Sequence, residues 1–197
     1  MRKTISLFGV LIAFLMFSAV AKADQVVLTA TLTGAQEVPP SGSPGIGSAL
    51  VTFDTVTNLL TVNVSFAGLV SPTIASHIHC CTPPGANALV ATPVPTFPGF
   101  PLGVTTGTYL QTFDMSLASS YNPAFITAHG GTVAGAQAAF VAGLLSGQTY
   151  LNIHTTQFPG GEIRGQLQPV PEPATMLLLA TGIFGAAGTL RKRRRKG

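Results

Sequence analysis

The chain has 197 residues and a formal net charge of +4, but its two ends carry almost all of the positive charge. Nine of the ten lysines and arginines fall within the first 22 or the last 7 residues. Residues 24–168 hold one base, Arg164, and five acids, so this part has a net charge of −4. Nucleic-acid binding needs clustered bases to neutralise phosphates, and the composition excludes it for the middle of the chain. That part is long enough to form one domain with one hydrophobic core.

The first 23 residues are predicted to be a secretory signal peptide. A charged start precedes an apolar run over residues 5–20 and an A-x-A cleavage tripeptide that ends at Ala23 and includes Ala21. The mature chain is therefore expected to begin at Asp24. A retained membrane helix is the alternative, and the short apolar run argues against it.

Residues 169–197 contain three segments in a fixed order. The tripeptide Pro171-Glu172-Pro173 comes first, an uncharged stretch over 174–190 follows, and a basic tail over 191–197 ends the chain. As a helix, 174–190 would be about 25 Å long, which is the short limit for crossing a bilayer core. The basic tail predicts that this end stays cytoplasmic and that the middle of the chain lies beyond the membrane.

This order of segments resembles the PEP-CTERM sorting signal. The resemblance implies processing by an exosortase, a membrane-embedded cysteine protease of Gram-negative bacteria that make exopolysaccharide. It also implies that 174–190 holds the protein in the inner membrane until cleavage near Pro171-Glu172-Pro173 delivers it to the cell surface or the exterior of a Gram-negative-type envelope. A permanent single-span anchor is the alternative.

The middle of the chain is predicted to be all-β. Apolar and polar residues alternate with period two in six segments, which are 25–33, 48–54, 60–66, 73–79, 149–155 and 161–167. Alternation on one face favours antiparallel pairing, and the many short strands favour a β-sandwich or barrel-like fold, similar to immunoglobulin or superoxide dismutase. Residues 82–103, with six prolines and three glycines, are predicted to be a long loop with a short strand near 88–91. One helix is expected over 133–145.

Four sequence motifs in the predicted domain, 24–168, together resemble the CHRD domain. They are GAQEVPP (34–40), HIH (77–79), YLNIHT (150–155) and FPGGEIRGQL (158–167). The resemblance covers 28–167 and implies an extracellular, β-sandwich-like domain, named after chordin, with no established enzymatic activity. The Cys80-Cys81 pair departs from the family, since many members carry a small or polar residue there.

Three histidines are candidates for a metal site. His77 and His79 are two residues apart, so a strand places both on one face, and His154 lies on the polar face of another strand. Neutral imidazole suits Zn²⁺ or Cu²⁺. The favoured prediction, however, needs no cofactor and is a structural polar network that includes Asn152, Glu162 and Arg164.

The predicted hairpin around residues 158–161 brings the members of this polar network to one face. It places Glu162 opposite His154 and Arg164 opposite Asn152. Glu162 is then expected either to orient His154 or to pair with Arg164.

The adjacent cysteines Cys80 and Cys81 have three possible states after export to an oxidising compartment. They can form a vicinal disulfide, which is the favoured prediction, an intermolecular bridge, or metal thiolates that complete a site with His77 and His79.

The sequence contains no recognised catalytic motif, so we predict no catalytic residues. The first functional hypothesis is a non-enzymatic protein of the cell surface or extracellular matrix that associates with exopolysaccharide. The alternatives are a zinc- or copper-binding or redox protein that uses the three histidines, and a binding module for a protein ligand.

Overall fold

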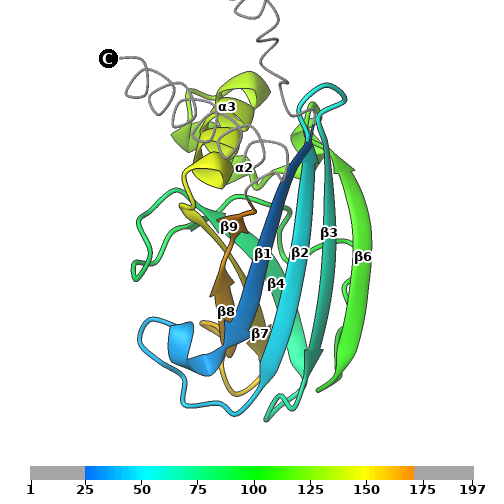
Figure 1. Ribbon diagram of the computed structural model, residues 1–197, viewed down its shortest axis with the longest axis vertical. Coiled ribbons are helices and arrows are strands. Elements are labelled where there is room, and N and C mark those ends of the chain that lie inside the picture. Colours follow the sequence, from blue (N-terminus) through cyan, green and yellow to red (C-terminus); the bar gives the residue numbers. More distant parts are fainter. Residues whose placement is uncertain (1–24, 171–197) are drawn as a thin grey trace, which may run out of the picture.

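The computed structural model of the protein describes residues 25–170, in which the strands form one curled antiparallel sheet. The sheet order is β5-β4-β7-β8-β1-β2-β3-β6, with β9 paired to β1. Figure 1 shows β1, β2, β3 and β6 as one layer, with β4, β7 and β8 crossing behind it. The predicted all-β, antiparallel fold is therefore confirmed as a curled half-barrel. The predicted signal helix and membrane helix lie outside the described residues.

The strands agree closely with the predicted segments. They are β1 Gln25–Thr33, β2 Ile46–Asp54, β3 Leu59–Ala67, β4 Thr73–Cys80, β5 Leu89–Val90, β6 Gly107–Asp114, β7 Thr149–Thr155, β8 Ile163–Gln166 and β9 Gln168–Pro169. The helices are α2 Pro123–Ala128 and α3 Val133–Leu145, and two 3-10 turns are η1 Gly34–Gln36 and η2 Ala118–Ser120. The strands β6 and β9 and the helix α2 were not predicted.

The core lies between the two layers of the curled sheet. In β3, for example, Leu60, Val62 and Val64 are buried, while Thr61 and Asn63 alternate with them and point outward. Full burial of such a side chain stabilises the fold by roughly 1.5–3 kcal/mol. The period-two pattern in the sequence is therefore the pattern of the core.

Strand β7, and strand β4 from Ala75 onward, are buried on both faces. A pattern of alternating buried and exposed residues does not predict this. All seven residues of β7 are buried. The proline-rich loop over 82–103 returns along β4, where the amides of Ala91 and Phe97 donate to the carbonyls of Ile78 and Ser76. The loop therefore covers this part of the sheet instead of extending into solvent.

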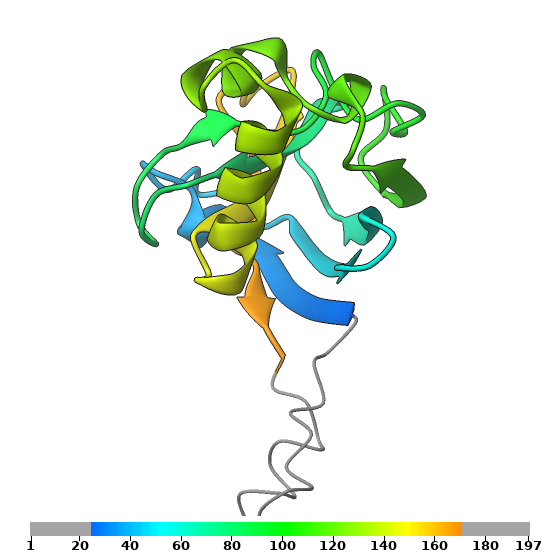
Figure 2. The same ribbon diagram turned by 90° about the horizontal axis from the view of Figure 1, so that it is seen from above.

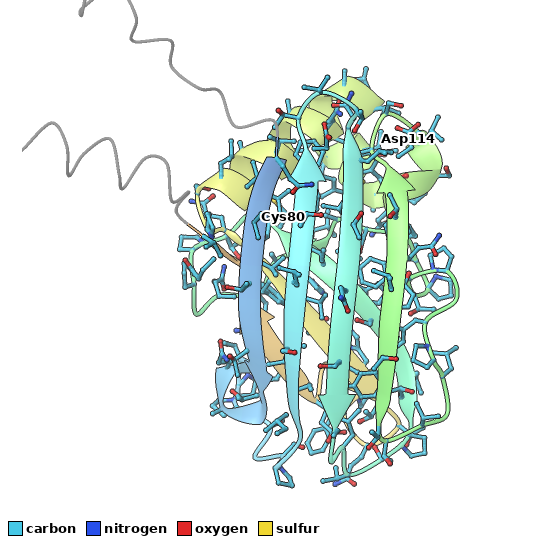
Figure 3. The ribbon with its side chains drawn as sticks, turned by 45° about the vertical axis from the view of Figure 1, so that its right-hand side comes forward. Cys80 and Asp114 are labelled. Carbon is cyan, nitrogen blue, oxygen red and sulfur yellow. A yellow bond between two sulfur atoms is a disulfide. The ribbon has the colours of Figure 1, made fainter. Side chains whose placement is uncertain are left out.

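The two helices cover one end of the half-barrel (Figure 2). Helix α3 has the predicted bounds, and the Thr132 side chain accepts a hydrogen bond from the Gly135 amide at its start. At Gly143 the helix packs against the sheet so closely that a Cβ would overlap Cys80 Sγ. Figure 3 shows Cys80 at this covered end.

Candidate metal centre

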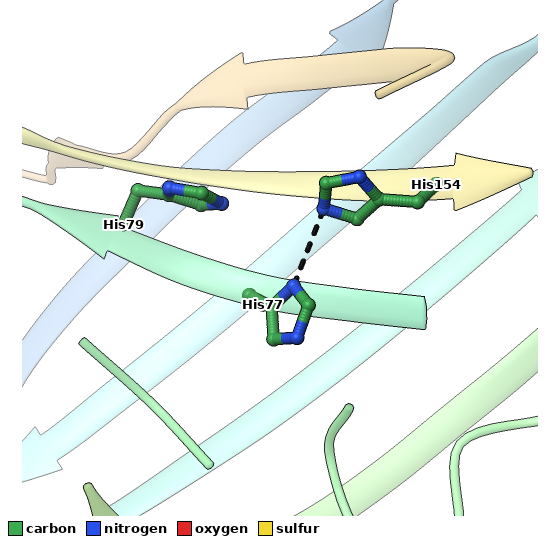
Figure 4. Close-up of side chains that lie close together, drawn as sticks. All are labelled: His77, His79 and His154. Atoms are coloured by element: carbon green, nitrogen blue, oxygen red, sulfur yellow. Dashed lines mark hydrogen bonds between the residues drawn. The ribbon is translucent and has the colours of Figure 1, made fainter. Parts of the chain in front are cut away.

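The antiparallel pair β4–β7 brings the three histidines together. In its register His77 lies opposite Asn152, His79 opposite Tyr150, and Ala75 opposite His154. Each imidazole is on the same face, as period two requires. Figure 4 shows the three rings pointing toward a common centre.

The rings are close enough to share one ligand. One nitrogen of each histidine lies within 4.8 Å of the corresponding nitrogens of the other two. His77 Nδ1 and His154 Nε2 are 3.2 Å apart, and this contact is the dashed line in Figure 4. The exposed fractions are 6% for His77, 8% for His79 and 9% for His154, so the centre is nearly sealed from solvent.

The second nitrogen of each ring points away from the centre, toward a backbone carbonyl. His77 Nε2 is 2.7 Å from the Pro95 carbonyl and His79 Nδ1 is 2.8 Å from the Ala88 carbonyl. His154 Nδ1 is 2.9 Å from the carbonyl of Pro159. A carbonyl oxygen only accepts, so each of these nitrogens must carry the hydrogen and donate it.

The tautomers fixed in this way leave three bare nitrogens facing one another. In a neutral ring, one nitrogen is protonated and the other has a lone pair. His77 Nδ1, His79 Nε2 and His154 Nε2 are therefore the lone-pair atoms. A metal-binding histidine typically donates its other N–H to a carbonyl or carboxylate in this way, which orients the ring and raises its basicity.

Burial keeps the three rings neutral. Desolvation, followed by the neighbouring His154, lowers the pKa of His77 to about 4. Desolvation also lowers the pKa of His79 to about 4, and it lowers the pKa of His154. Two lone pairs 3.2 Å apart repel each other unless a cation lies between them. A proton on His77 could be that cation, but burial disfavours the protonated ring at neutral pH. The arrangement thus has the chemistry of a metal site.

His79 stacks on Tyr150, and Tyr150 in turn contacts Arg164, outside the centre. The Tyr150 ring lies 4.7 Å from the His79 ring at an interplanar angle of 8°. The Arg164 guanidinium lies 4.5 Å from the centroid of the Tyr150 ring on the next strand. Arg164 also donates to the Gln36 carbonyl and to Asn87 Oδ1. The stack therefore holds the ring plane of His79.

Glu37 is the buried acid of this region, and sequence reasoning missed it. Its Oε2 is 3.8 Å from Arg164 Nε, and its Oε1 has no hydrogen-bond partner among the described residues. Burial raises its pKa to about 7, although Arg164 opposes this. The GAQEVPP motif was a usable signal, because it contains this acid. Together with the segment 157–161, Glu37 and the residues after it line a cleft of about 340 Å³.

The predicted role of Glu162 is wrong. Its carboxylate accepts hydrogen bonds from Ser43 Oγ, the Val70 amide and Thr155 Oγ1, and it pairs with neither His154 nor Arg164. Strand β8 begins only at Ile163, so the alternation of the strand does not govern Glu162. Asn152 does lie opposite Arg164 as predicted, but the acid near Arg164 is Glu37, so the expected network of Asn152, Glu162 and Arg164 does not form.

The structure joins Cys80 and Cys81 in a vicinal disulfide. Both sulfurs face Gly143 of α3. Of the three states that the sequence left open, this one removes the thiolates from the histidine centre.

The chain is thus a small all-β domain in which two neighbouring strands and three loop carbonyls position three histidines. The family model of the CHRD domain matches residues 28–167, and the chain belongs to the CHRD domain family. A second model, the PEP-CTERM protein-sorting motif, matches residues 169–195. Searches of curated proteins and of solved structures gave no match.

The two matches indicate how the protein is exported and sorted. A CHRD domain followed by a PEP-CTERM motif is exported, anchored in the membrane before processing, and sorted by an exosortase-type system to the cell surface or exterior. Within residues 25–170, neither helix has the length and apolar character needed to cross a bilayer. The signal cleavage site at Ala21 and Ala23 and the sorting site at Pro171-Glu172-Pro173 lie outside the described residues.

Proposed function

We propose that this exported CHRD-domain protein is a non-enzymatic metal-binding protein that holds one zinc or copper ion through His77 Nδ1, His79 Nε2 and His154 Nε2. The observation that carries the proposal is the convergence of three bare nitrogens whose rings are each fixed by a backbone carbonyl. The distance between His77 Nδ1 and His154 Nε2 suits this role, and the His79 nitrogen lies within 4.8 Å of both. Two metal–nitrogen bonds at a tetrahedral angle span about 3.3 Å, against 3.2 Å between His77 and His154.

The surroundings favour holding a metal over turning over a substrate. General acid–base chemistry needs a free acid or base within reach of a substrate. Among the described carboxylates, Asp54 and Asp114 accept hydrogen bonds in exposed turns, and Glu162 accepts three hydrogen bonds. Glu37 is the exception, because one of its oxygens has no hydrogen-bond partner among the described residues, but its side chain is buried beside Arg164. The nearly sealed rings leave little room for a substrate.

Metal analysis of the purified protein tests this function. We expect about one zinc or copper ion per chain, and loss of that ion on His77→Ala, because two remaining imidazoles do not hold a tightly bound ion. His129→Ala is the matched control, since His129 packs on Phe125 at the end of α2. A wild-type protein that takes up no stoichiometric ion would contradict the proposal, as would equal occupancy in the His77 variant.

A second candidate function is association with exopolysaccharide, carried by the outer face of β1, β2 and β3. A groove of about 700 Å³ there is lined mainly by hydroxyl and amide side chains, including Thr31, Asn63 and Ser65. Such groups donate and accept hydrogen bonds with sugar hydroxyls. The exosortase route would deliver this face to a polysaccharide-rich exterior.

Co-sedimentation with exopolysaccharide isolated from the producing cells tests the groove. We expect Asn63→Arg to weaken binding about tenfold, because it removes hydrogen bonds and fills the groove. Thr112→Arg is the control, on the outer face of β6 and outside the groove lining. Equal binding of the two variants would refute a role for the groove.

A further inference from the structure

Three buried polar atoms without a hydrogen-bond partner adjoin the histidine centre. They are Glu37 Oε1, Asn152 Oδ1 and His79 Nε2. The side chain of Asn152 lies within hydrogen-bonding range of His79. On its other side, the Asn152 amide nitrogen lies close to Gly161, and so does Glu37 Oε1. Leaving such an atom unpaired costs about 1–3 kcal/mol, so three of them in a row require an explanation.

All three atoms are lone-pair atoms. A single cation would satisfy His79 Nε2 and Asn152 Oδ1 directly, and Glu37 Oε1 could then accept the amide N–H of Asn152. Asn152 lies directly opposite His77 in the β4–β7 register, on the face that carries the three histidines. Side chains at such opposed positions have Cβ atoms about 4.5–5.5 Å apart. The Asn152 oxygen is therefore within reach of an ion bound to His77 and His79.

We propose that Asn152 Oδ1 is the fourth ligand of the histidine centre and that the resulting set of three imidazole nitrogens and one amide oxygen binds Cu²⁺. The inference rests on the proposed metal-binding function and deepens it. The HxH of β4 supplies two nitrogens, and the NxH of β7 supplies one nitrogen and one oxygen.

Glu37 is placed to orient this ligand. Its free oxygen lies on the side of Asn152 where the amide nitrogen is, so the carboxylate can accept the N–H and turn the amide oxygen toward the ion. Gly161 makes the approach possible. A Cβ there would lie 2.5 Å from Glu37 Oε1 and 2.9 Å from Asn152 Nδ2, and the φ of Gly161 is +130°.

The donor set favours Cu²⁺ over Cu⁺. Soft thiolate and thioether ligands select Cu⁺, and the two cysteine sulfurs here are joined to each other and face α3. Imidazole nitrogen and neutral oxygen donors suit Cu²⁺, which binds such sites more tightly than the other divalent first-row ions. An oxidising exterior keeps copper in that state.

Copper titration by chelator competition, with paramagnetic resonance spectra, tests the fourth ligand. Asn152→Leu keeps the number of side-chain heavy atoms and their branching but removes the oxygen, so we expect the Kd for Cu²⁺ to rise about 10- to 100-fold and the spectrum to change. Asn152→Asp keeps an oxygen at that place and should restore wild-type-like affinity. Gln111→Leu, at an exposed position of β6, is the control.

Three results would overturn the assignment. The first is an Asn152→Leu protein whose Kd and spectrum both equal those of the wild type. The second is a folded Asn152→Asp protein that binds as weakly as the leucine variant. The third needs only the wild type: a water ligand would broaden the Cu²⁺ spectrum in water enriched in the magnetic oxygen isotope, and an Asn152 ligand would not. Failure of the metal-binding function itself looks different, since the wild type then takes up no copper.

Discussion

Replacement of Glu162 by alanine is expected to lower the free energy of unfolding by about 3–5 kcal/mol. Glu162 has no exposed surface, and its carboxylate accepts from Ser43 Oγ at 2.6 Å, the Val70 amide at 2.7 Å and Thr155 Oγ1 at 2.6 Å. Truncation opens a cavity and removes the acceptor of the buried Thr155 hydroxyl and of two partly buried donors, and a buried donor left unpaired costs about 1–3 kcal/mol. The Glu162 carboxylate ties three separate segments of the chain together.

Urea unfolding of wild type, Glu162→Ala and Glu162→Gln measures this effect. Glutamine keeps the shape and one acceptor oxygen, so its loss should be smaller, about 1–2 kcal/mol. Gln157→Ala, on the exposed part of the same hairpin, is the control. An alanine variant within about 1 kcal/mol of wild type would contradict the structural role assigned to Glu162.

Acidification of the metal-free protein is expected to lower its free energy of unfolding, and this is the second large effect. A histidine with a lowered pKa in the folded state stays neutral there while its unfolded counterpart takes up a proton. Stability is therefore fully present above about pH 6.5 and is lost as the pH falls toward about 4, the pKa of His77 and of His79. The loss is about 3 kcal/mol for each of these two rings.

Glu37 acts in the opposite direction and sharpens the test. Its pKa is raised from 4.5 to about 7, so its contribution is present at low pH and is lost as the pH rises through that window. Two histidines outweigh one glutamate, so the net effect of acid is destabilising. Urea unfolding in steps from neutral to acid pH should show falling stability, with a shallower fall in His79→Gln. A flat profile would mean that the rings are not neutral in the fold.

Most of the strands could be predicted because burial on one face leaves a period of two in the sequence. Strand β6 was missed because its pattern is weak. Leu110 is 67% exposed on the outer face, and only Tyr109 and Phe113 of this strand are buried. Helix α2 was missed because six residues are too few to show a helical period, although Asn122 and Pro123 are a usable start signal.

The candidate site was predicted in part. The spacing of His77 and His79 predicts that both lie on one face of a strand. It does not predict which strand pairs with β4, because pairing between residues more than seventy apart depends on how the whole sheet closes. The error at Glu162 has a local cause. The hairpin was continued one residue too far, to a position before β8 begins, and there the side chain turned toward the donors of other segments.

The sequence by itself determined the export route, through its two terminal signals, and the all-β class, through the alternation of its side chains. Only the tertiary structure decided what the histidines face. The carbonyls of Ala88, Pro95 and Pro159 that fix the three tautomers belong to loops, and a backbone carbonyl is the same in every residue. Its position therefore leaves no trace in the sequence and exists only once the chain has folded.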